Sequence, residues 1–186
     1  RPDHDYYGWK LSKGESYDPL TSHSIHLEEV LAVAKHQGVK FEVGDILLIR
    51  SGYTDTYYKF AAADPARLDD AGSLHPCLAG VAQTEEMKAW LHDNYFSAVA
   101  GDAPAWECWP PKEWALVRRS DQRLSNRADK ILLIAGVPAW FLGRSDRRDA
   151  LAKQCEQEKR WSFFFMSTAL NMPGGVASLA NSVTIH

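Results

Sequence analysis

Two carboxylates lie close together after a predicted strand, where they could take part in acid–base chemistry. Asp102 follows a short apolar strand predicted at Ser97–Ala100 and precedes Pro104. It could position water or a substrate; the alternative is a turn aspartate that bonds its own backbone. Glu107 follows on the same loop, and paired carboxylates can share proton transfer. The alternative for Glu107 is a solvated side chain.

Three further side chains near these positions could bind a substrate. Arg50 ends a predicted buried strand and could grip a carboxylate through two hydrogen bonds. The alternative for Arg50 is a structural salt bridge, to Asp45 or Asp102. Tyr53 and Trp106 could stack on an aromatic substrate, or they could pack on the core.

The histidines do not show the spacing of a metal site. His23 and His26 lie three residues apart at a predicted helix entrance. His75 and His92 lack a partner at metal-ligand spacing. His4 is expected to lie in a frayed terminus. We therefore assign no metal ligand from the sequence.

Cysteine count and charge exclude several classes of protein. Three widely separated cysteines argue against a disulfide framework and favour a reducing compartment, so we expect a cytoplasmic protein. The formal net charge is −3, and the arginines between residues 118 and 127 are interrupted by aspartates. We interpret these arginines as a solvated face and expect no nucleic-acid partner. No run is long and apolar enough to span a bilayer, so we expect no membrane partner.

Hydrophobic spacing predicts the elements that must position these residues. Apolar residues at helical spacing predict a helix over 27–36, with Gly38 as its stop. The run Ile46–Ile49 predicts a strand buried on both faces. A second helix is predicted from Thr84, as N-cap, to Tyr95. Residues 64–80 are expected to form a loop, and residues 1–24 carry no clear helix or strand signal.

The remaining segments complete an alternating pattern. A short helix is predicted at 57–63, a later helix at 149–159 and strands at 137–142 and 161–168. The run 130–135 is compatible with helix or strand, and 104–127 is expected to be an irregular loop. Gly174-Gly175 predicts a tight turn. Without a repeat or a dividing linker, 1–186 is expected to form a single α/β or α+β domain.

Four segments, taken in order, resemble the cyclase superfamily of metal-dependent hydrolases, which includes kynurenine formamidases and isatin hydrolases. They are Tyr17-Asp18-Pro19 with Ser22-His23, the run from Gly44 to Tyr53, the run from Ala98 to Pro104 with Trp109-Pro110-Pro111, and the run from Leu170 to Ser178. The fungal branch of the family is the most similar. Each segment is short, and their order and spacing carry the resemblance.

The resemblance implies a swivelling β/β/α fold, a homodimer and a divalent metal, zinc or manganese. It also implies hydrolysis of a small amide or lactam, such as N-formylkynurenine in tryptophan breakdown. In the family, the aspartate at the position of Asp102 borders the active site. We therefore expect Asp102 as a catalytic residue and Tyr53, Trp106 and Glu107 as substrate-binding residues.

The chain departs from the family at the metal ligands. The family's first ligand motif, His-x-Gly-Thr-His-x-Asp or a variant, is absent, which suggests the C-terminal portion of a longer protein. Aligning the later motif on Leu133–Gly136 places Lys130 and Arg144 near the ligand positions. Protonated lysine and arginine do not ligate metals.

Two functions stay open on these residues. The first is a metal-dependent amide hydrolase that takes its metal ligands from other residues. The second is a catalytically inactive protein of the same fold, used for binding or as a structural protein.

Overall fold

The structure is a computed structural model that describes residues 3–71, 77–111, 132–133, 146–169 and 180–185. Its centre is a parallel sheet of four strands in the order β1-β3-β5-β6. The strands are β1 (Asp3–His4), β3 (Ile46–Ile49), β5 (Ala98–Gly101) and β6 (Leu132–Leu133). Because all four run parallel, their carboxyl ends meet at one edge of the sheet.

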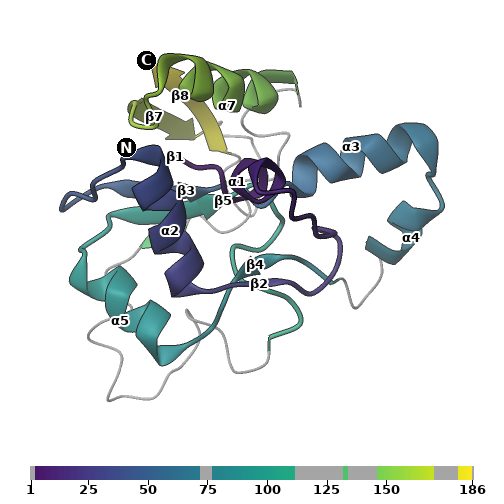
Figure 1. Cartoon of the computed structure of the whole chain (residues 1–186), viewed down its shortest axis with the longest axis horizontal. Coiled ribbons are helices and arrows are strands. Elements are labelled where there is room, and N and C mark those ends of the chain that lie inside the picture. Colours follow the sequence, from purple (N-terminus) through teal and green to yellow (C-terminus); the bar gives the residue numbers. More distant parts are fainter. Residues whose placement is uncertain (1–2, 72–76, 112–131, 134–145, 170–179, 186) are drawn as a thin grey trace.

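Helices and two smaller sheets surround this centre (Figure 1). The helices are α1 (Tyr6–Ser12), α2 (Leu27–Gln37), α3 (Tyr53–Ala63), α4 (Arg67–Ala71), α5 (Glu85–Asp93) and α7 (Asp146–Glu158). Strand β2 (Ser24–Ile25) pairs in parallel with β4 (Gly80–Val81), and β7 (Phe164–Ala169) pairs antiparallel with β8 (Ala180–Ile185). In Figure 1, α7 and the β7–β8 hairpin lie on the opposite side of the sheet from α2 and α5.

Successive residues of β3 point to opposite faces of the sheet, and both faces are covered. Leu47 and Ile49 pack with α2 and α5 in one core cluster. Ile46 and Leu48 pack in a second cluster, which includes Cys155 of α7. The side-chain period of a strand is two, so an unbroken apolar run is the pattern of a strand buried on both sides. The prediction for this strand is confirmed.

The two helices with the clearest end signals also agree with the sequence. Helix α2 ends at Gly38, whose φ of 67° lies in the left-handed region that favours glycine. Helix α5 begins after Thr84, whose hydroxyl accepts a hydrogen bond from the Met87 backbone N–H at 3.2 Å. In both cases, local chemistry at the helix end fixes the boundary.

Other expectations were wrong or incomplete. Helix α3 begins at Tyr53 rather than at residue 57, so the turn before it is only three residues long. The terminus expected to be frayed contains β1, which pairs with β3, and it is followed by α1. Helix α4 and strand β4 occur where a loop was expected. These elements are too short to produce a periodic signal, and they depend on neighbours distant in sequence.

Some sequence predictions lie outside the described residues. They concern the strand over 137–142, the Gly174-Gly175 turn, most of the loop 104–127 with its arginines, and the positions of Lys130 and Arg144. The run 130–135 is described only at Leu132–Leu133, which is strand. None of the described helices has the length and apolar character needed to cross a membrane.

Candidate functional site

The carboxyl ends of three strands bring polar residues together at one edge of the central sheet. Asp5 follows β1, Arg50 and Ser51 follow β3, and Asp102 follows β5. Since β3 lies between β1 and β5, the Arg50–Ser51 segment lies between the two aspartates. In open parallel sheets this edge is where ligands bind.

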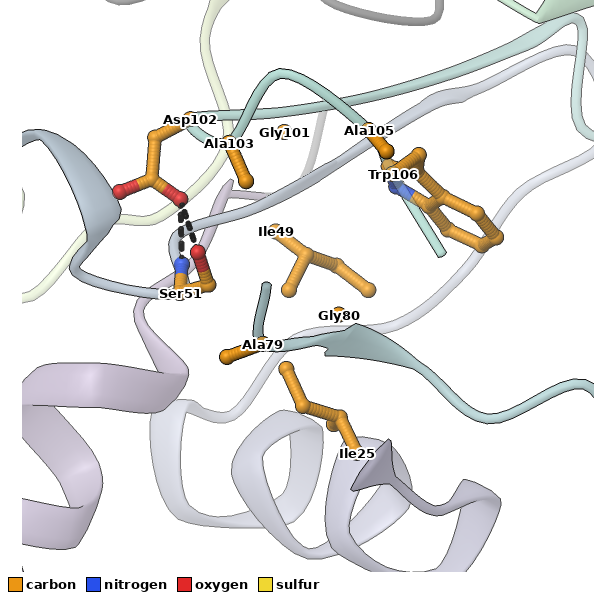
Figure 2. Close-up of a pocket in the computed structure, with 10 residues that line it drawn as sticks. All are labelled: Ile25, Ile49, Ser51, Ala79, Gly80, Gly101, Asp102, Ala103, Ala105 and Trp106. Carbon is orange, nitrogen blue, oxygen red and sulfur yellow. Dashed lines mark hydrogen bonds between the residues drawn. The ribbon is translucent and has the colours of Figure 1, made fainter. Parts of the chain in front are cut away.

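Asp102 is buried, with 5% of its surface exposed, and it bonds to Ser51 across the strands. One carboxylate oxygen, Oδ1, accepts the Ser51 backbone N–H at 2.6 Å and the Ser51 hydroxyl at 2.7 Å (Figure 2). The second oxygen points away from these bonds, toward the start of α3. Negative charge is favourable near a helix N-terminus, so Asp102 also stabilises the N-terminus of α3.

A small cavity lies beside this pair. It has a volume of about 10 Å³, which is room for about one water molecule. Ser51 and Asp102 contribute hydroxyl and carboxylate groups to a lining that otherwise consists mainly of aliphatic side chains and glycines (Figure 2). A bound molecule would therefore meet polar groups on one side only.

The N-terminal segment holds the turn between β3 and α3 in place. The Tyr7 backbone N–H donates to the Arg50 carbonyl at 3.1 Å, and Arg50 Nη1 pairs with Asp5 Oδ1 at 2.9 Å. Gly52 has a φ of 80°, and a Cβ at this position would collide with the Tyr7 ring. This position therefore requires glycine both for its backbone angle and for the close approach.

Tyr17 fixes the same turn from another direction. Its hydroxyl donates to the Ser51 carbonyl at 2.5 Å. Burial, and then the negative charge of Asp102, raises the pKa of Tyr17, so the hydroxyl keeps the proton that it donates. Ser51 is thus bonded through its carbonyl to Tyr17 and through its N–H and hydroxyl to Asp102.

An aromatic and charged network lies behind Tyr17. The His23 ring stacks on Tyr17 with centroids 4.1 Å apart. The Tyr6 hydroxyl lies 2.9 Å from His23 Nε2 and donates to Glu29 Oε1 at 2.9 Å. Burial raises the pKa of Glu29, but hydrogen bonds from Lys10, the His26 N–H and Tyr6 together lower it below its usual value. Glu29 is therefore an ionised acceptor for Tyr6.

The structure brings Trp106 to the cavity and places Tyr53 beyond it. Trp106 is buried in the core, lines the cavity and donates from Nε1 to the Ala100 carbonyl at 3.2 Å. Tyr53 is the first residue of α3, and its ring stacks on the Tyr57 ring with centroids 6.3 Å apart. Burial, then Tyr57 and Asp102, raises the pKa of Tyr53. Their roles in substrate binding stay predictions.

Two alternatives from the sequence need correction. Glu107 is not solvated; it is only 8% exposed, and Gln83 Nε2 donates to its Oε2 at 2.8 Å. Arg50 does form a salt bridge, but its partner is Asp5 rather than Asp45 or Asp102. Both errors have one cause: Gln83 follows β4 and Asp5 follows β1, and the sequence alone does not show which segments lie beside these strands.

Sequence reasoning missed Ser51 and Tyr17 as parts of this site. Ser51 directly follows a buried strand, and Tyr17 lies in one of the segments that carries the family resemblance. Position after a strand was a usable signal for Ser51. Only the folded chain shows the bond from Tyr17, since 34 residues separate the two.

The described residues do not fit the divalent metal that the resemblance implies. Within those ranges, no group of three or more histidine, cysteine, aspartate or glutamate side chains could hold an ion. Zinc sites use three or four such donors. Around Asp102, one carboxylate oxygen already accepts two hydrogen bonds from Ser51. We therefore derive no metal site from the described part of the chain.

Comparison with known proteins supports the fold. The chain matches no protein-family model and no curated protein. A solved structure described as a novel cyclase matches with a TM-score of 0.69 and 24% sequence identity. The match covers 100% of this chain and 53% of that protein, so the chain spans about half the length of the cyclase. The predicted cyclase-like α+β fold is confirmed, and the similarity at this identity concerns the fold alone.

Proposed function

We propose that this chain belongs to a metal-dependent hydrolase of small amides, with an arylformamidase-like activity. The carboxyl edge of β1, β3 and β5 would form one wall of its active site. The observation that carries the proposal is the buried Asp102–Ser51 pair, which borders a cavity at the ligand-binding edge of a cyclase-like sheet.

The chemistry of this wall suits binding and orientation. Asp102 Oδ1 accepts hydrogen bonds from the Ser51 backbone N–H and hydroxyl, so the Asp102 side chain holds Ser51 in place. Buried polar groups beside a cavity fix the orientation of a small ligand at low cost in reorganisation. The ligands for a divalent ion would come from residues outside the described ranges or from a second copy in a homodimer.

The proposal is tested by metal analysis and activity measurements on the natural full-length protein. Metal analysis should find about one divalent ion per active site, and N-formylkynurenine should be hydrolysed in a reaction that a chelator stops. Asp102→Asn should lower kcat/KM by about tenfold or more, because the carboxylate that orients Ser51 is lost. Asp93→Asn is the matched control, since Asp93 is 69% exposed on α5. A full-length protein that neither binds a metal nor hydrolyses N-formylkynurenine would exclude this function.

A second candidate is a catalytically inactive protein of the same fold, used for binding or as a structural protein. The small size of the cavity favours it, because room for about one water molecule does not admit an aryl amide without movement. This candidate predicts no turnover of N-formylkynurenine even with added zinc or manganese. Any turnover that is lost in Asp102→Asn would rule it out.

A further inference from the structure

We propose that His23 is a positioning residue for the candidate site and that it holds two sides of the cavity in place. Ser51 and Gly80 line the cavity, whereas His23 lies behind them. The ring of His23 acts on Ser51 through Tyr17, and its backbone carbonyl holds Gly80. The inference rests on the proposed function, because His23 affects turnover only if this cavity borders the active site.

The hydrogen bonds of the Tyr6 hydroxyl assign the tautomer of His23. Tyr6 has one hydroxyl proton, which it directs to Glu29 Oε1 at 2.9 Å. Burial raises the pKa of Tyr6, so the hydroxyl stays protonated, and the ionised Glu29 can only accept. The Tyr6 oxygen must therefore accept from His23 Nε2, which lies 2.9 Å away. His23 is thus held as the tautomer with the proton on Nε2.

The ring of His23 forms one side of an aromatic cage around Tyr17. The two rings stack with centroids 4.1 Å apart and an angle of 17° between their planes. The rings of Tyr6 and Tyr7 have centroids 5.6 and 5.8 Å from that of Tyr17, in tilted and edge-on orientations. Because neighbours on several sides restrict rotation of the Tyr17 side chain, its hydroxyl is kept on the Ser51 carbonyl.

The backbone of His23 reaches another side of the cavity. Its carbonyl oxygen accepts the Gly80 N–H at 3.0 Å, next to the pairing of Ser24 with Gly80 in β2 and β4. A Cβ at Gly80 would collide with the Glu107 backbone, so this strand is closely packed on both sides. His23 therefore connects the cavity wall at Gly80 with the wall at Ser51 (Figure 2).

NMR of the unaltered, isotope-labelled chain tests the tautomer. The Nε2–H of His23 should give a resonance that exchanges slowly with water at neutral pH, and the nitrogen shifts should show an unprotonated Nδ1. His36 is the matched control, because it is exposed on α2 and its ring protons should exchange too fast to be seen. A proton on Nδ1 rather than Nε2 of His23 would overturn the inference.

Two substitutions of His23 test its hold on Ser51. His23→Leu removes the planar ring and the Nε2–H, whereas His23→Gln keeps a planar amide that can donate to Tyr6. His23→Leu should speed hydrogen exchange of the Ser51 backbone N–H about fivefold, the loss expected for one aromatic contact. His23→Gln should speed it much less. The Leu47 N–H of β3 is the reference, because a general loss of stability would speed exchange at both residues.

A double-mutant cycle tests whether His23 acts through Tyr17. Tyr17→Phe removes the hydroxyl that holds the Ser51 carbonyl and should itself speed exchange at Ser51. Adding His23→Leu should then change the Ser51 rate little, because two substitutions on one route are not additive. Additive effects, or equal acceleration at Ser51 and Leu47, would overturn the inference. If His23→Leu does not fold, His23→Phe takes its place in the cycle and should speed exchange at Ser51 more than at Leu47.

Turnover distinguishes this inference from the proposed function. In a full-length protein that hydrolyses N-formylkynurenine, His23→Leu should lower kcat about threefold to tenfold, and His23→Gln should restore most of the loss. Faster exchange at Ser51 in a protein without turnover would exclude the proposed function and keep His23 as the residue that positions the turn. Turnover with unchanged exchange at Ser51 in His23→Leu would keep the function and exclude this role of His23.

Discussion

The two faces of the central sheet are built from different kinds of contact. On the face toward α2 and α5, the core includes Tyr6, Trp9 and Trp106 together with aliphatic residues. Tyr6 and Trp106 donate hydrogen bonds from within this cluster, and Tyr17 packs against it. This is the face whose side chains continue into the cavity beside Asp102.

The opposite face is covered by apolar contact. Ile46, Leu48 and Ala100 pack against Cys155 and Phe165. The outward side of β7 is apolar as well, because Phe164 is 57% exposed and alternates with buried neighbours. The comparison suggests that hydrogen bonds specify geometry on the face with the site, while burial of apolar area stabilises the other face.

The largest expected effect on stability comes from replacing a leucine by alanine, which can be done on each face of the sheet in turn. Leu47→Ala should lower the free energy of unfolding by about 4 kcal/mol, because Leu47 is fully buried among large side chains. Leu48→Ala should cost about 2–3 kcal/mol, since Leu48 keeps 8% exposure and has Ala98 and Ala100 nearby. Denaturant unfolding of both variants measures the difference. Equal losses in the free energy of unfolding would show that the two faces contribute equally to stability.

A glycine pair tests whether the turn after β3 is as tightly held as its contacts indicate. Gly52→Ala should cost about 2–4 kcal/mol, the sum of a left-handed backbone angle and a collision with Tyr7. Gly14→Ala is the matched control, because Gly14 has a φ of 74° and open space around it, and should cost about 1 kcal/mol. Thermal and denaturant unfolding give both values. A cost for Gly52→Ala no larger than that for Gly14→Ala would contradict the close packing.

The smallest effect concerns pH and the network behind Tyr17. Burial lowers the pKa of His23 below its usual 6.5; Glu29 opposes this shift, and Lys10 and His26 reinforce it. A lowered folded pKa means that His23 contributes stability above pH 6.5 and that this stability is lost as pH falls through the folded value. Unfolding measured between pH 7.5 and 5 should show the decline, and His23→Gln should flatten it. A slope unchanged by His23→Gln would remove His23 from the pH response.

The elements with strong local chemistry could be predicted from the sequence. The unbroken run Ile46–Ile49, the N-cap Thr84 and the stop at Gly38 each gave a correct element. The position of Asp102 after a short strand pointed to the edge of the sheet where the cavity lies. In these cases neighbours along the chain supply the determining interactions, so the pattern is readable without the fold.

The site itself depended on contacts between distant segments. Ser51 meets Asp102 across 51 residues, and Tyr17 reaches Ser51 across 34. Short elements such as β1 and α4 produced no signal, and the alternative of a solvated Glu107 was wrong because the side chain is buried. Residue types identified candidate site residues here, but they could not identify the hydrogen-bond partners of those residues.

By itself, the sequence determined the alternation of helices and buried strands, since burial on one or both faces leaves a periodic record in the residue types. Only the tertiary structure decided that the Ser51 hydroxyl donates a hydrogen bond to Asp102 and that the Ser51 carbonyl accepts one from Tyr17. The physical reason is that a hydrogen bond depends on distance and direction within a few tenths of an ångström, and strand order and register set both.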